Sequence, residues 1–127
     1  MTINKTVFRL GEPVNIKIRI KNIGNETLVL CFTDGRDHPG FIVYNFLNSE
    51  VYHFDFFYLK FQVFSKISPS GEYSFGNYTV WYQKVYPRQN YHLSKAPPGI
   101  YYIVGEFVSV SLKLTIRTPP ITIKIVG

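Results

Sequence analysis

The stretch VNIKIRIK, residues 14–21, decides the fold class because apolar and polar side chains alternate along its whole length. Val14, Ile16, Ile18 and Ile20 are apolar, and the residues between them are asparagine, lysine or arginine. Alternation with a period of two predicts a β-strand that has one face in a core and the other in water.

Turn-forming residues on both sides of this strand predict its neighbours. Gly11-Glu12-Pro13 precedes it and Asn22-Ile23-Gly24-Asn25 follows it. Thr27 to Phe32 then predicts a returning strand, which would close a hairpin with the first one. Residues 33–40 contain two glycines, a proline and two aspartates, and this composition predicts a loop.

The rest of the chain repeats this pattern of short strand-like runs separated by turn residues. No window of about 12 residues shows a helical period. The pattern predicts an all-β fold, an immunoglobulin-like antiparallel β-sandwich of about seven to nine strands, in one domain over residues 1–127. Trp81 is expected in the core, and Pro119 and Pro120 predict an edge or a switch between sheets. The further expected strands are residues 41–46, 51–54, 55–64, 72–85, 100–110, 112–116 and 121–126.

The composition agrees with a globular domain. Of 127 residues, 46% are hydrophobic and 17% are charged, which excludes a disordered chain. No apolar run approaches the roughly 18 residues that cross a bilayer, so no transmembrane segment is expected. The net charge is +6, but the cations are scattered. Their densest group, Lys17, Arg19 and Lys21, lies on the polar face of one strand, which predicts a solvated surface, with an anion-binding stripe as the alternative. No nucleic acid partner is expected.

Cysteine and asparagine usage bear on the compartment. Cys31 is the single cysteine, which excludes an intramolecular disulfide, and its apolar neighbours predict a buried thiol. Three N-x-S/T sequons begin at Asn4, Asn25 and Asn77, where chance predicts about one. They favour an extracellular or cell-surface glycoprotein. A cytoplasmic location is the alternative, because residues 1–5 enter strand-like sequence without a secretory leader.

Four stretches spread over most of the chain carry a family resemblance: FRLGEPV (8–14), KNIGNETL (21–28), GFIVY (40–44) and APPGIY (96–101). In this order they resemble the immunoglobulin-like domain of the intracellular proteinase inhibitor family of the BsuPI type. The resemblance implies that fold and, as an alternative function, a soluble proteinase inhibitor that uses an exposed loop such as 33–40 or 86–98.

The last of these stretches also has a plain physical interpretation. Pro97-Pro98-Gly99 reverses the chain into a strand, and Tyr101 follows where a corner tyrosine could hydrogen-bond back to the turn.

The predicted loop contains the densest group of titratable side chains, Asp34, Arg36, Asp37 and His38. Two carboxylates and a histidine could hold a cation, but a calcium loop needs more oxygen ligands and a zinc site needs four ligands. A solvated turn and a partner-recognition loop are the other interpretations, and the second makes these four residues candidate binding residues. No metal site and no cofactor are expected.

The sequence favours a non-catalytic domain. It contains no G-x-S-x-G, H-E-x-x-H, P-loop or G-x-G-x-x-G motif. The eight Asp and Glu residues form no evident acid/base pair on adjacent strand positions.

An unusually aromatic segment, residues 52–64, is the second candidate binding surface. As a strand it would place Phe54, Phe56, Tyr58 and Phe64 on one face, and a face of this kind outside the core marks an interface. The alternative is a connection that plugs the edge of the sandwich and buries both of its faces.

These observations together predict a domain that acts through a protein partner or through self-association. Strand addition at an open sheet edge is one concrete mode, and residues 121–125 are the expected edge.

Overall fold

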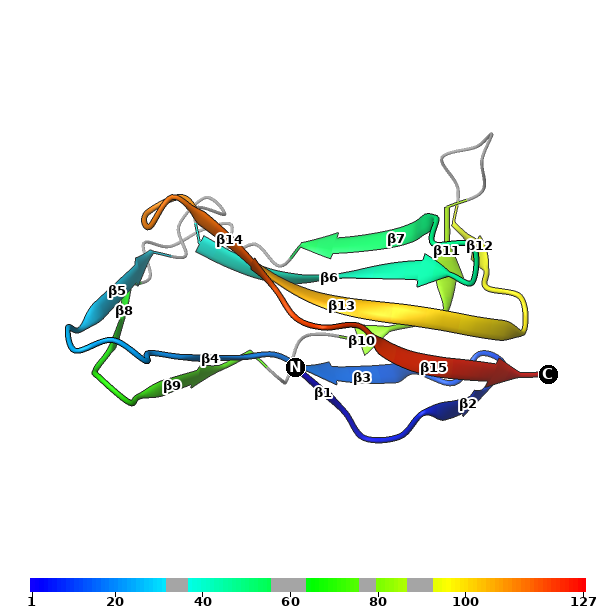
Figure 1. Cartoon of the computed structure of the whole chain (residues 1–127). Coiled ribbons are helices and arrows are strands. Elements are labelled where there is room, and N and C mark those ends of the chain that lie inside the picture. The colour runs from blue at the N-terminus through cyan, green and yellow to red at the C-terminus, as the bar shows by residue number, and fades with distance from the viewer. Residues whose placement is uncertain (32–36, 56–63, 76–79, 87–92) are drawn as a thin grey trace.

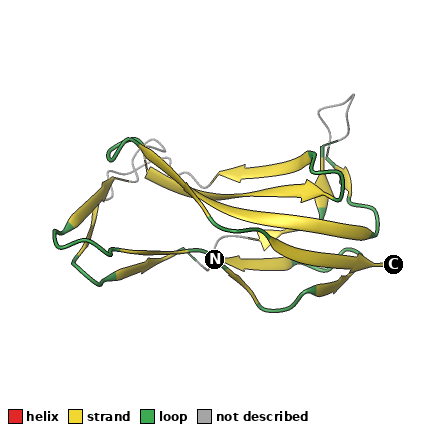
Figure 2. Cartoon of the chain, in the orientation of Figure 1, coloured by secondary structure: helices red, strands yellow, loops and turns green. Residues whose placement is uncertain are grey.

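The computed structural model describes residues 1–31, 37–55, 64–75, 80–86 and 93–127. Within these residues every regular element is a β-strand, as Figure 2 shows, and there is no helix of the length and apolarity that a membrane span needs. The strands are β1 (Thr2–Ile3), β2 (Val7–Arg9), β3 (Val14–Lys17), β4 (Arg19–Lys21), β5 (Leu28–Cys31), β6 (Asp37–Asn45), β7 (Glu50–Asp55), β8 (Phe64–Ile67), β9 (Glu72–Ser74), β10 (Val80–Trp81), β11 (Lys84–Val85), β12 (Ser94–Lys95), β13 (Gly99–Ser109), β14 (Leu114–Arg117) and β15 (Ile121–Val126).

The larger layer is a sheet with the strand order β2-β15-β13-β6-β7, and β14 also pairs with β13. The long strands β6 and β13 are antiparallel over their shared length, from the pair Tyr101–Asn45 to the pair Ser109–Asp37. Among the described residues of this sheet, β2 and β15 form the one parallel pair. The alternating burial of β13 gives the sheet one face for a core, because Tyr101, Ile103 and Phe107 are buried on it.

The second layer consists of short strand pairs whose members are far apart in the sequence. β3 pairs with β10, β4 with β9 and β5 with β8, all antiparallel. Between β4 and β5 the buried side chain of Asn22 donates from Nδ2 to the carbonyls of Glu26 (2.7 Å) and Ile67 (2.9 Å). The predicted hairpin between residues 14–21 and 27–32 is therefore wrong. The turn residues bend the chain but do not reverse it, because Asn22 ties the bend to the opposite strand.

The core lies between these two layers. Figure 1 shows the strands β7, β6, β13, β15 and β2 of the larger sheet in this order from top to bottom. Val14, Ile16 and Ile18 are at most 4% exposed while Asn15 and Lys17 are exposed, so the half-buried strand predicted from their alternation is confirmed. The all-β antiparallel sandwich is confirmed with it. The buried apolar residues of the core are Phe8, Val14, Ile16, Ile18, Leu30, Phe41, Val43, Ile67, Phe75, Trp81, Ala96, Tyr101, Ile103, Phe107, Ile123 and Ile125.

The corner before β13 has the predicted form. Gly99 has a φ of +153°, a conformation that side chains rarely adopt, and this lets the chain turn into the strand. The Tyr101 hydroxyl donates to the Pro97 carbonyl at 2.6 Å. The Tyr101 ring meets Trp81 edge to face at 5.5 Å between centroids, and Trp81 is fully buried as expected.

Residues 37–40 are not part of a loop, as their composition had predicted, but begin β6. They pair with β13 from the pair Asp37–Ser109 to the pair Gly40–Glu106. Pro39 is tolerated there because, in the described part of the chain, the pairing of β6 with β7 ends at Gly40–Asp55. The long partner strand β13 outweighs the local turn composition.

The C-terminal strand is not the open edge that was expected. β15 lies between β13 and β2, which pair with it on opposite sides. The two prolines before it do not switch sheets, because β14 and β15 both pair with β13. Cys31 also differs from expectation, since its thiol is partly exposed rather than buried.

Candidate functional site

A group of polar side chains lies on the face of the larger sheet that points away from the core. In the register of β7, β6 and β13, Asp55 is opposite Gly40, and Gly40 is opposite Glu106. Directly opposite residues of neighbouring strands point to the same face, so the two carboxylates stand on either side of a glycine. His53, two residues before Asp55, shares this face.

Gly40 makes the close approach of these side chains possible. A Cβ atom at this position would lie 2.3 Å from the Phe54 carbonyl oxygen and 2.9 Å from Asp55 Oδ1. No larger residue fits without moving the backbone of β7. The Asp55 carboxylate therefore lies over the middle strand in space that a side chain would otherwise fill.

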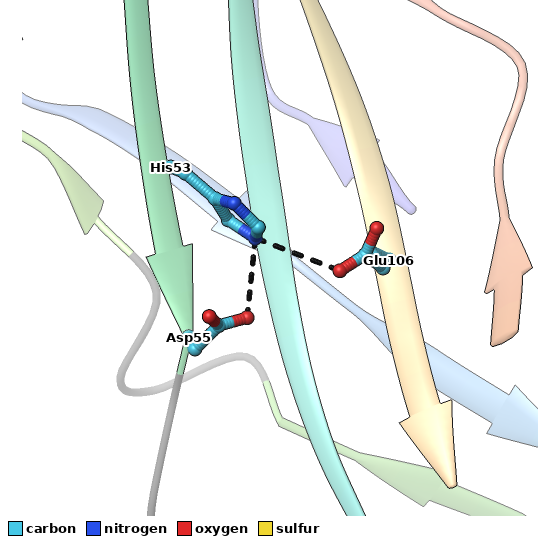
Figure 3. A group of neighbouring side chains, drawn as sticks. All are labelled: His53, Asp55 and Glu106. Carbon is cyan, nitrogen blue, oxygen red and sulfur yellow. Dashed lines mark ion pairs between the residues drawn. The ribbon is translucent and has the colours of Figure 1, made fainter.

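His53 points between the two carboxylates, as Figure 3 shows. Its Nε2 atom is 3.2 Å from Asp55 Oδ1 and 3.5 Å from Glu106 Oε1. One ligand atom from each of the three residues lies within 4.8 Å of the others. The Nε2 atom is buried and has no hydrogen-bond partner in the described structure. A second histidine, His38, has Nε2 at 3.5 Å from the same Asp55 oxygen.

Glu106 is oriented from its other side by Arg117 of β14. The Arg117 Nε donates to Glu106 Oε2 at 2.9 Å, and this hydrogen bond raises the pKa of the guanidinium above its ordinary value. Glu106 is nearly buried, with a side chain 5% exposed, so its charge needs such a partner. The contact leaves Oε1 directed at His53.

The donor atoms of this group are those that hold divalent transition metals. Imidazole nitrogen and carboxylate oxygen together suit zinc and its neighbours in the first transition row. His53, Asp55 and Glu106 are the residues that could hold such an ion.

Asp37, one of the predicted binding residues, has a different role from the one expected. It is 1% exposed and accepts hydrogen bonds from Cys31 N (2.7 Å), Ser109 Oγ (2.8 Å) and Ser111 N (3.1 Å). Burial alone would raise the pKa of Asp37, but these hydrogen bonds outweigh it and hold the pKa below its ordinary value. Asp37 is thus a buried acceptor that holds Cys31, Ser109 and Ser111 together, and not a surface contact.

The other predicted site residues divide into three groups. Phe54 packs on the core side, with its ring stacked on Phe41 at 5.4 Å between centroids, so the expectation that it is exposed is wrong. Asn4 and Asn25 are exposed. Asp34, Arg36, Phe56, Tyr58 and Asn77, together with the side chain of Phe64, lie outside the described part of the structure.

A second surface of interest is the hairpin of β13 and β14. Every residue of β14 is exposed, and in the described residues β14 pairs with β13 alone. Leu114 and Ile116 are 37% and 54% exposed, and Val110 and Leu112 in the turn are 58% and 38% exposed. Within the described residues β14 is thus one open edge of the larger sheet, and it carries exposed apolar side chains.

A pocket of about 190 Å³ lies beside this edge, where the two layers part. Ile18 and Ile20 line it from the β3–β4 side, and Phe107 and Ile116 line it from the hairpin. We call this pocket the seam. Together with β14 it forms an apolar strip at the side of the sandwich.

Sequence reasoning missed both features, although each had a signal. His53 and Asp55 are two residues apart in a strand, and Glu106 is the only charged residue of β13. A lone carboxylate in an apolar strand calls for a partner. That His53 and Asp55 supply its neighbours depends on the register of three strands, which the local sequence does not specify.

The comparisons with known proteins bear on the fold alone. No family model and no curated protein matches the chain. Two solved structures of β-glucosidase from Listeria innocua match it at 12% identity, one of a mutant in complex with laminaribiose and one in complex with glucose. Each covers 99% of this chain, with TM-scores of 0.53 and 0.51. The chain spans only 15% and 16% of their lengths, so the likeness is to one portion of each enzyme and shows a shared β-sandwich architecture.

Proposed function

We propose that this chain is a non-catalytic β-sandwich domain, extracellular or at a cell surface, that acts through protein contacts. In this proposal an extended segment of a protein partner adds as a strand beside β14. The observation that carries it is the exposed strand β14, which in the described residues pairs with β13 alone and is apolar at Leu114 and Ile116. An exposed edge of this kind is a template for pairing with another chain.

The seam favours binding by strand addition rather than binding of a partner to a flat surface. Side chains of an added strand alternate between faces, so every second one would point towards Ile18, Ile20 and Phe107. Backbone hydrogen bonds along β14 would supply affinity and the seam would select apolar side chains. The strip thus offers both halves of a strand-addition site.

The test compares two substitutions on the same strand. Ile116→Lys places a charge at the seam, whereas Thr115→Lys places the same charge on a side chain of the opposite face. We expect Ile116→Lys to weaken partner binding about tenfold or more and Thr115→Lys to leave it nearly unchanged.

The measurement is native mass spectrometry of the protein isolated from its source, followed by hydrogen exchange of the complex. Slower exchange of the amides of residues 114–117 in the complex supports the proposal. A protein that is monomeric and free of any partner, or a complex in which these amides exchange as in the free chain, overturns it.

The extracellular location rests on the sequons. Asn4 and Asn25 are exposed in the structure, so sugars can be attached at both without unfolding. We expect the protein from its source to lose mass on enzymatic removal of N-linked glycans, and Asn25→Gln to remove one step of that loss. An unmodified mass would favour the cytoplasmic alternative.

The second candidate is a soluble proteinase inhibitor of the BsuPI type. It rests on the four stretches that resemble this family, the last of which, residues 96–101, contains the corner where the Tyr101 hydroxyl donates to the Pro97 carbonyl. In this case the chain inhibits a serine proteinase, and substitution of Arg36 or Arg88, which both lie outside the described residues, abolishes inhibition. Absence of inhibition across a panel of serine proteinases counts against it.

A further inference from the structure

We propose that the chain binds one zinc ion through His53, Asp55 and Glu106, with His38 next to the site. The ion would connect the outer strand β7 to β13 across β6. This inference does not rest on the proposed function, because its three ligands lie on β7 and β13 and not on β14.

The distances fit a tetrahedral ion. Zinc binds histidine nitrogen and carboxylate oxygen at about 2.0–2.2 Å, so two ligand atoms on a tetrahedron are about 3.3–3.6 Å apart. His53 Nε2 is 3.2 Å from Asp55 Oδ1 and 3.5 Å from Glu106 Oε1. His38 Nε2 is 3.5 Å from Asp55 Oδ1, so His38 lies beside the site as a partner of one of its ligands.

The described residues do not complete the hydrogen bonding of this group. The His53 Nε2 atom is buried, has two carboxylate oxygens near it, and has no hydrogen-bond partner among the described residues. An imidazole nitrogen carries at most one proton and can donate it to one acceptor. A cation between the three groups would satisfy the nitrogen and both oxygens at once, and would offset the repulsion between two nearby carboxylates.

The surroundings hold the ligands in place. Arg117 occupies Oε2 of Glu106 and so leaves Oε1 for the ion. Metal-binding carboxylates are commonly fixed in this way by an outer hydrogen bond. Gly40 provides the space, since a Cβ atom there would lie 2.9 Å from Asp55 Oδ1.

The donor set selects zinc over the abundant hard cations. Calcium and magnesium take oxygen ligands, whereas this site presents imidazole nitrogen at its centre. His53 and Asp55 on β7 and Glu106 on β13 would supply three ligands, and the ion would join these two strands across β6. The role we assign to the ion is to stabilise the sheet.

The experiment is calorimetric titration of ZnCl₂ into the whole chain after removal of metals with EDTA and dialysis. We expect one zinc per chain and a rise in melting temperature on saturation. His53→Ala and Glu106→Gln should each lower the affinity at least about tenfold, and Arg117→Gln should lower it about tenfold by freeing Glu106 to move.

Two matched controls separate this site from incidental binding. Glu50→Gln removes a carboxylate from the same strand β7, and Cys31→Ser removes the partly exposed thiol. Both should bind zinc as the unchanged chain does, as should Ile116→Lys at the proposed partner edge. Loss of zinc binding in Cys31→Ser would place the ion elsewhere and overturn the proposal.

A nitrogen-resolved spectrum of the histidine rings keeps the test decisive if a variant fails to fold. In the unchanged chain, zinc should shift the Nε2 resonance of His53. No saturable binding at one ion per chain, equal affinity in His53→Ala, or a bound ion that leaves this resonance unmoved each overturns the proposal.

Discussion

Asp37 and His53 are polar residues of the same sheet, and their surroundings are opposite. Asp37 accepts three hydrogen bonds from Cys31, Ser109 and Ser111. The Nε2 atom of His53 is equally shielded from water yet has no hydrogen-bond partner among the described residues. A buried polar group completed by its own chain contributes stability, whereas one left incomplete points to a ligand. Five predictions test how far this difference extends.

The largest effect is expected for Asp37→Ala. The substitution removes a charged acceptor and leaves the Cys31 and Ser111 amides without it, so the free energy of unfolding should fall by about 3 kcal/mol. Urea denaturation measures this. Glu50→Gln is the control, because it changes an exposed carboxylate on the neighbouring strand β7. A loss in the free energy of unfolding below about 1 kcal/mol for Asp37→Ala would show that the hydrogen bonds of Asp37 are not important for stability.

Acidification should remove part of the same contribution. The folded-state pKa of Asp37 lies below its ordinary value of 3.8, so the unfolded chain takes up the proton first as the pH falls. The stabilisation is thus present above that ordinary value and is lost as the pH falls through the folded-state pKa. The free energy of unfolding should be measured from neutral pH to pH 3 for the unchanged chain and for Asp37→Asn. The difference between the two free energies should become smaller as the pH falls. A gap that stays constant contradicts the assignment.

Gly40→Ala should destabilise the chain by about 2 kcal/mol and also prevent zinc binding. The added Cβ would meet the Phe54 carbonyl oxygen at 2.3 Å, a backbone atom that moves only with its strand. Thermal unfolding with and without zinc separates the two effects. Gly24→Ala, where the nearest contact is an ordinary 3.4 Å, is the control, and equal losses in both variants would argue against crowding at the site.

Tyr101→Phe is expected to cost about 1 kcal/mol, because it deletes one hydroxyl and its 2.6 Å hydrogen bond to Pro97 while keeping the ring against Trp81. Tyr101 thus lies between Asp37, which accepts three hydrogen bonds, and His53 Nε2, which has none among the described residues, because its buried hydroxyl makes one. Denaturant titration gives the value. Tyr82→Phe, at an exposed position, should change stability far less.

The smallest effect is expected for His53→Leu without metal. In the absence of zinc the free energy of unfolding should change by no more than about 0.5 kcal/mol, because Asp55 keeps His38 and Glu106 keeps Arg117. Melting curves of His53→Leu and of the unchanged chain in EDTA test this. When zinc is added, the melting temperature of the unchanged chain should rise and that of His53→Leu should not. A loss in EDTA as large as that of Asp37→Ala would remove the contrast on which the metal proposal depends.

Local patterns in the sequence were enough for the fold class and for several single residues. Alternation over residues 14–21 predicted a half-buried strand, and the structure buries Val14, Ile16 and Ile18. The turn before Tyr101 predicted its hydrogen bond to the chain behind it. These features depend on contacts within a few residues, or on the difference between an apolar and a polar side chain, and both can be read from neighbouring positions.

What the tertiary structure alone decided is which strands lie together. Residues 14–21 pair with β9 and β10 and not with the segment that follows them, because the buried Asn22 bends the chain without reversing it. His53 and Glu106 become neighbours only through the register of β7, β6 and β13. Pairing between distant strands is set by the packing of the whole sandwich, so no local pattern determines it.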